Sequence, residues 1–138
     1  MDETEQNELN DFIDAWTETE TKTRTAFLRL KTCLEAKDKA DLAFKARPGV
    51  SYSLRCACPG HDRQLFVMAD VIDDDPANRW LSVCFYGDMI NDPDELGDLI
   101  PGGLLGEDGY CFDIDEGEDA LLGYIEARID EAYQSALG

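Results

Sequence analysis

Basic residues are scarce in this sequence. Its 138 residues include 12 Lys and Arg against 31 Asp and Glu, which leaves a formal net charge of −19. Because binding to a nucleic-acid backbone needs a dominant positive field, we expect no nucleic-acid partner. No apolar run approaches the roughly 18 residues that span a membrane, so we expect no membrane partner. The opening MDETEQ is acidic where a secretory signal would be basic, which favours a cytoplasmic protein.

Groups that carry catalysis are equally scarce. The sequence has one histidine, His61, and no serine in a nucleophile-elbow motif. The glycine-rich run from Gly102 to Gly106 has no lysine to serve a phosphate-binding loop. Cys58 and His61 are near enough in sequence to form a dyad, but a turn holds such a pair poorly. We therefore assign no catalytic residues, and a small enzyme is our third interpretation.

The charges are segregated along the chain. Residues 1–21 carry eight acids and no base, residues 22–63 carry ten bases and four acids, and residues 64–138 carry nineteen acids and two bases. One explanation is internal, with a basic helix and hairpin lying against acidic neighbours. The other is a bipolar surface that docks a basic protein partner.

Residues 3–37 show a helical pattern and contain no Gly or Pro. Two apolar stripes are present, one of Leu9, Phe12, Ile13 and Trp16, and one of Phe27, Leu30, Cys33 and Leu34. A threonine-rich polar segment separates them, and we expect it to divide two helices near residues 19–21, although one long helix is the alternative. Residues 1–18 then form a detached helix or one that makes a homodimer through residues 9–16, and Trp16 is either folded back on the body of the protein or used by a second subunit.

Four strands follow in close succession. The ranges 41–47 and 51–58 alternate apolar and polar residues, and two strands rich in β-branched and aromatic residues lie between Gln64 and Gly87. Short turns join all four, which predicts an antiparallel meander with the last two strands at its centre. The near-continuous apolarity of the first of these two runs, from Leu65 to Met68, predicts strands covered on both faces, or nearly so.

The remaining sequence predicts one more strand and two helices. Asp92 and Pro93 form a helix start, and Pro101 ends that short helix. Residues 110–114 form a fifth strand, and Asp115 with Glu118 caps a long final helix. The fold class is therefore a single α+β domain: N-terminal helices, a five-stranded mostly antiparallel sheet, and a long C-terminal helix packed on it.

The five cysteines are an odd number, and in a reducing compartment we expect free thiols, with Cys84 and Cys111 buried and inert. Cys56, Cys58 and His61 form the one metal-ligand pattern, three soft ligands in six residues, suited to zinc or iron. No second pair of ligands is present, so the alternative is a structural hairpin. We expect no other cofactor.

The second half resembles the small bacterial YdhG/YjbR-like domains, whose wider grouping includes the frataxin-type fold. The matching stretches cover about half the chain: residues 80–86, 92–96, 106–109 and the final helix to Tyr133. The Cys56–His61 turn and the threonine-rich segment are not part of that pattern. The resemblance implies a non-enzymatic protein that holds iron on an acidic ridge.

These observations favour a non-catalytic interaction or regulatory domain. The runner-up is a protein that holds iron or zinc through Cys56, Cys58 and His61 or through the acidic N-terminal helix.

Overall fold

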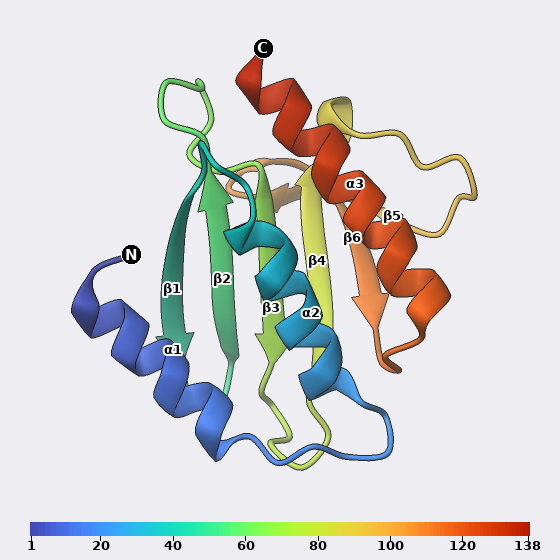
Figure 1. The fold of residues 1–138 in the computed structure, drawn as a ribbon. Helices are drawn as coiled ribbons and strands as arrows, with labels where there is room; N and C mark the ends of the chain where they lie inside the picture. Colours follow the sequence, from blue (N-terminus) through green and yellow to red (C-terminus); the bar gives the residue numbers. More distant parts are fainter.

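The computed structural model describes all 138 residues and contains three helices beside one antiparallel sheet (Figure 1). The helices are α1 (Glu3–Ala15), α2 (Thr23–Glu35) and α3 (Asp119–Leu137), and a short 3-10 helix η1 covers Gly87–Met89. The strands are β1 (Asp41–Arg47), β2 (Ser51–Ala57), β3 (Val67–Ile72), β4 (Trp80–Tyr86), β5 (Asp98–Leu104) and β6 (Glu107–Ile114). None of the helices combines the length and hydropathy that crossing a membrane requires.

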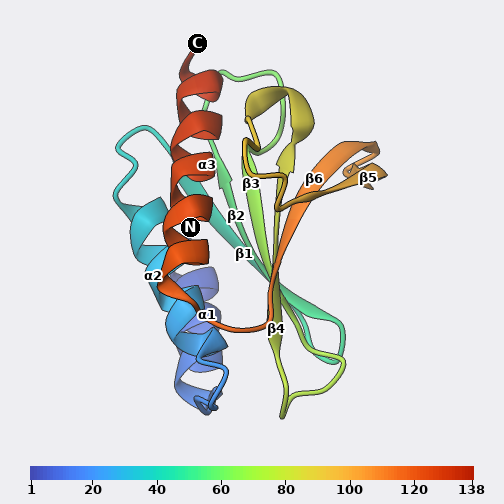
Figure 2. The ribbon, with the colours of Figure 1, turned by 90° about the vertical axis from the view of Figure 1, so that its right-hand side faces the viewer.

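The strand order is β1-β2-β3-β4-β6-β5, with every neighbouring pair antiparallel. The predicted meander is confirmed, and β3 and β4 lie at the centre of the sheet as expected. All three helices lie on one face (Figure 2). The opposite face has no helix over it. Residues of both faces are nonetheless largely covered, because β3 alternates buried and half-buried residues and the last four residues of β4 are all buried.

One continuous core fills the space between the helices and the sheet. Phe27 and Leu30 of α2 and Ile125 and Ile129 of α3 are almost completely buried. They pack on a row of sheet residues that share the helix-side face, namely Phe44, Leu54, Ala69, Val83 and Phe112.

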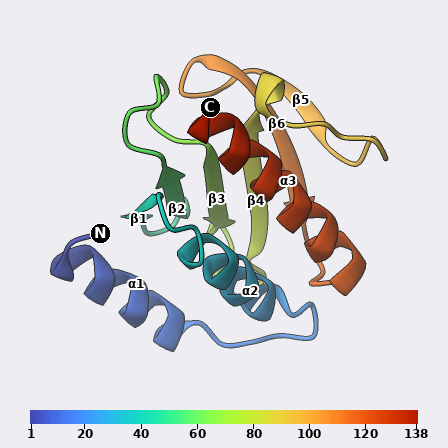
Figure 3. The same cartoon turned by 45° about the horizontal axis from the view of Figure 1, so that its top comes forward.

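The N-terminal segment forms two helices rather than one. The break falls in the threonine-rich segment, where Lys22 adopts a left-handed backbone with φ of 58°. Helix α1 is not detached, because its apolar stripe is buried in the core of the same chain: Leu9, Phe12, Ile13 and Trp16. Figure 3 shows α1 running beside β1, at the opposite end of the helix layer from α3. The apolar face on which the dimer hypothesis depended is therefore already covered.

The region after β4 differs from the prediction. No helix forms at Asp92, because its carboxylate accepts hydrogen bonds from the N–H groups of Leu96 and Gly97 and closes a turn, and Glu95 has a left-handed φ of 55°. The chain then pairs with β6 as β5, so the sheet has six strands rather than five. The last helix begins at Asp119 with Glu118 as an N-cap that makes no side-chain hydrogen bond, so the predicted Asp115 capping box is wrong.

Two of the five cysteines are joined. Cys84 of β4 and Cys111 of β6 stand directly opposite one another and form a disulfide, with Cα atoms 4.1 Å apart. The expectation of five free thiols is therefore wrong for this pair. Cys33, Cys56 and Cys58 are free, as expected. The pairing depends on the strand register, which brings together residues 27 positions apart.

Candidate functional site: the hairpin groove

The β5–β6 hairpin and the turn before it carry four of the seven large hydrophobic residues that are exposed. Leu96, Leu99, Ile100 and Leu105 are between 42% and 55% exposed, and all four lie in β5 or its flanking turns. The hairpin projects from the sheet, away from the helix layer (Figure 2). Exposed large apolar side chains are therefore concentrated on one projecting element.

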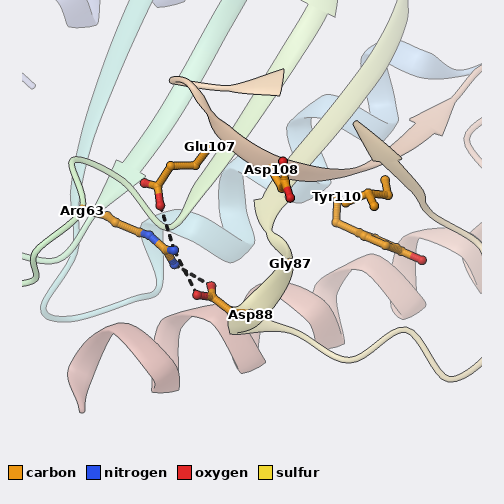
Figure 4. Close-up of a pocket in the computed structure, with 7 residues that line it drawn as sticks. Arg63, Gly87, Asp88, Glu107, Asp108 and Tyr110 are labelled. Atoms are coloured by element: carbon orange, nitrogen blue, oxygen red, sulfur yellow. Dashed lines mark hydrogen bonds and ion pairs between the residues drawn. The ribbon is translucent and has the colours of Figure 1, made fainter. Parts of the chain in front are cut away.

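Three adjoining hollows lie along this hairpin, and we call them together the hairpin groove. The central hollow has a volume of about 460 Å³ and contains Leu99, Glu107, Asp108 and Tyr110 of the hairpin (Figure 4). A second hollow of about 310 Å³ shares Gly87 and Tyr110 with it, and a third of about 170 Å³ shares Arg63 and Glu107. The shared residues show that the second and third hollows each adjoin the central one.

Arg63 is the one base in the groove, and its charge is fully engaged. Its guanidinium donates to both oxygens of Asp88, at 2.6 and 3.0 Å, and to Glu107 at 3.1 Å (Figure 4). The same group stacks on the ring of Tyr86, 4.1 Å from its centre. The hydrogen bonds from Arg63 hold the pKa of Asp88 below its usual value. Arg63 therefore fixes the loop before β3 to the hairpin and leaves no free positive charge.

Asp92 organises the other end of the groove. Burial raises its pKa, but hydrogen bonds from the Tyr124 hydroxyl and from the Gly97 and Leu96 amides outweigh burial and lower it overall. Tyr124 belongs to α3, so this carboxylate ties the turn before β5 to the last helix. The Asp94 amide donates to the same hydroxyl. The groove thus has fixed acidic groups at both ends.

The charge of the groove is strongly one-sided. Six acids contribute to it, Asp62, Asp88, Asp92, Glu95, Glu107 and Asp108, against the single base Arg63. A larger hollow of about 510 Å³ between α2 and α3 is balanced, because Arg29 and Lys37 face Glu126 and Asp130 there and pair with them. An unbalanced negative potential beside exposed leucines is therefore a property of the hairpin groove.

The residues that the sequence suggested as metal ligands lie elsewhere. Cys56 and Cys58 are buried, and burial raises the pKa of the Cys56 thiol to about 12. The His61 amide donates to the Cys58 carbonyl, and its ring Nε2 is buried without a hydrogen-bond partner. No three His, Cys, Asp or Glu side chains meet in an arrangement that could hold a metal ion. The structure also shows no hydrogen bond between His61 and either thiol.

The sequence showed that the second half of the chain is acidic, but not that several of its acids gather at the hairpin groove. Leu99 and Ile100 stood in a segment interpreted as helix, and Glu107 and Asp108 lay between that segment and the predicted fifth strand. The exposed leucines beside Pro101 were the signal that could have located the site, because loops seldom gather large apolar side chains.

Comparison with known proteins gives no match: no family model, no curated protein and no solved structure matches this chain.

Proposed function

We propose that the protein is a non-catalytic interaction domain whose hairpin groove docks a basic segment of another protein. The observation that carries the proposal is the coincidence of exposed leucines and six groove acids on one projecting hairpin. Apolar contact supplies affinity at such a surface, and the acidic potential steers a basic partner to it. A second copy of this chain is a poor occupant, since every copy brings the same negative charge to the contact.

The whole-chain charge balance supports the same partner chemistry. Of the nineteen acids after residue 63, seven take part in ion pairs: Asp73, Asp88, Glu107, Asp119, Glu126, Asp130 and Glu131. Twelve are left without one. The basic segment 22–63 therefore offsets part of the acidic half through α2 and Arg63, and a large negative excess is left for an external partner.

The test uses a capped seven-residue peptide of alternating lysine and valine as the probe. We expect it to bind the full chain, with an affinity that falls steeply as salt rises from about 50 to about 200 mM, because exposed charge pairs are screened. A Glu107→Gln, Asp108→Asn double variant should weaken binding about fivefold to tenfold, since each exposed ion pair contributes up to about 1 kcal/mol. Both amides keep an oxygen that can accept the hydrogen bonds from Arg63 and Gly102.

The matched control is an Asp74→Asn, Asp75→Asn variant, which removes the same charge from the exposed β3–β4 loop. We expect it to change the affinity by roughly twofold or less, by loss of long-range attraction alone. Equal weakening by the two double variants would show a diffuse charge effect and refute docking at the groove. No binding of the probe at either salt concentration would refute the proposal as well.

A further inference from the structure

The two edges of the sheet are exposed to very different degrees. At the β1 edge, α1 runs alongside, and Glu5 of that helix accepts a hydrogen bond from the Phe44 N–H at 3.1 Å (Figure 1). A helix beside an edge strand is one of the ways in which proteins block further strand pairing. At the other edge, β5 is the outermost strand and pairs with β6 alone. β5 is therefore the edge that another strand can reach.

The strand register identifies which groups face outward from β5. In an antiparallel sheet, opposed residues whose Cα atoms are about 4.5 Å apart make no main-chain hydrogen bonds to each other, whereas those whose Cα atoms are about 5.5 Å apart do. Cys84 and Cys111 are 4.1 Å apart, so the main-chain groups of Cys111 turn toward β5 and meet those of Asp98. The next residue along β5 has the opposite orientation. Leu99 therefore directs its N–H and C=O away from β6, to the free edge.

The same alternation follows from the far side of the sheet. The Phe44 N–H points outward to Glu5, so Phe44 and Leu54 are not hydrogen-bonded to each other. The alternation can be followed from that starting point across the paired residues of β2, β3, β4 and β6. It again shows that Cys84 and Cys111 make no main-chain hydrogen bonds to each other. Two independent starting points thus give Leu99 the same outward orientation.

The outward groups of β5 are few and well defined. The regular pairing with β6 is interrupted after Ile100, Pro101 has no N–H, and the Gly102 N–H is already bound to Asp108 at 3.1 Å. An incoming strand thus meets one donor and one acceptor, both at Leu99. Pro101 limits the pairing to a short stretch, which keeps β5 from extending into an open-ended sheet.

We propose that the basic partner adds a short strand to the edge of β5, paired through Leu99. This rests on the proposed function and names its mode of binding, which is β-augmentation. A partner residue opposite Leu99 lies on the same face as Leu99, where the groove acids Glu107 and Asp108 favour lysine or arginine. Its neighbours point to the other face, where the exposed Ile100 favours apolar residues. The partner chemistry is therefore an extended segment in which basic and apolar residues alternate.

Amide hydrogen exchange tests the pairing with the lysine–valine peptide as the probe. In the free protein the Leu99 N–H is unpaired, and we expect fast exchange. With the peptide at saturation, exchange at Leu99 should slow by about tenfold or more, as expected for a newly paired strand amide. The Phe44 N–H serves as the internal control, because Glu5 already occupies it and the peptide should not change its rate.

A pair of variants tests the contribution of the outward Leu99 N–H to peptide binding. Leu99→Val and Leu99→Pro both shorten the side chain, but only proline removes the outward N–H. Because that N–H makes no bond to β6, its removal breaks no hydrogen bond of the hairpin. We expect Leu99→Pro to bind the peptide about fivefold to tenfold more weakly than Leu99→Val, the effect of one hydrogen bond.

The outcomes separate the two proposals. Peptide binding that depends on the groove acids, with Leu99 exchange unchanged, overturns strand addition and leaves the docking function standing. Failure of the peptide to bind overturns both. Slowed exchange at Leu99 supports strand addition even where a Leu99 variant does not fold, since it is measured on the unaltered chain.

Discussion

Asp70 carries a buried carboxylate in the middle of the sheet. It lies in β3 on the face without helices, between Ser53 of β2 and Ser82 of β4. One of its carboxylate oxygens is buried without a hydrogen-bond partner. Burial raises its pKa, and neither the Ser53 hydroxyl nor the nearby arginine charges of Arg55 and Arg47 bring it back to the ordinary value. The ionised side chain therefore opposes folding.

We predict that Asp70→Asn stabilises the protein at pH 7, raising the melting temperature by about 3 °C if the gain is near 1 kcal/mol. The pH dependence has a definite sign. Below the unfolded value of 3.8 both states hold the proton, so the substitution gains nothing there. As pH rises through the higher folded pKa, the unfolded chain is favoured by ionisation and the advantage of asparagine grows.

Thermal melts of both proteins between about pH 3.5 and pH 7 measure this difference. Asp74→Asn, in the exposed loop, is the control and should shift the melting temperature little. An Asp70→Asn variant that is less stable at pH 7 would show that the carboxylate makes a favourable interaction that outweighs its burial.

Among the elements, α1 is held by an aromatic cluster around one arginine. The Phe12 ring stacks on Tyr52 with centres 3.9 Å apart, and the Arg79 guanidinium lies 5.0 Å from the Phe12 centre. Arg79 also donates to the buried Asp73 at 2.7 Å. Trp16 closes the cluster at the end of the helix. The helix is thus part of the core.

We predict that Phe12→Ala lowers the free energy of unfolding by about 3–5 kcal/mol, as loss of a buried phenylalanine does. Asp14→Ala, on the exposed side of the same helix, should have little effect. Denaturant unfolding measures both. A small effect of Phe12→Ala, together with a dimer-to-monomer change in light scattering, would restore the hypothesis of a dimerising helix.

The elements that sequence predicted well are those specified by local pattern. Residues 41–58 alternate apolar and polar side chains, the two later runs are rich in β-branched and aromatic residues, and turn residues separate the runs, so the meander could be predicted. β5 could not, because Pro101 and two glycines are typical of loops and its residues are mostly exposed. The groove and the Cys84–Cys111 bond depend on strand register, a long-range property that no local pattern of these residues records.

At the scale of the whole molecule, some charges pair with one another within the protein and others are left unpaired at its surface. Basic α2 lies against acidic α3, and Arg29 and Lys37 form ion pairs across that contact. Exposed pairs of this kind contribute little stability each, so they organise the helix layer more than they strengthen it. The acids of the hairpin have one base, Arg63, between them, and the negative field is concentrated where the leucines are exposed.

The most direct measurement of the central claim is a map of backbone amide chemical shifts as the lysine–valine peptide is titrated into the full chain. We predict that the changed amides cluster in residues 62–63 and 87–110, the hairpin groove and its turns, with α1 and the β1 edge unaffected. Changes spread evenly over the acidic residues, or centred on α1 or the α2–α3 contact, would contradict the account.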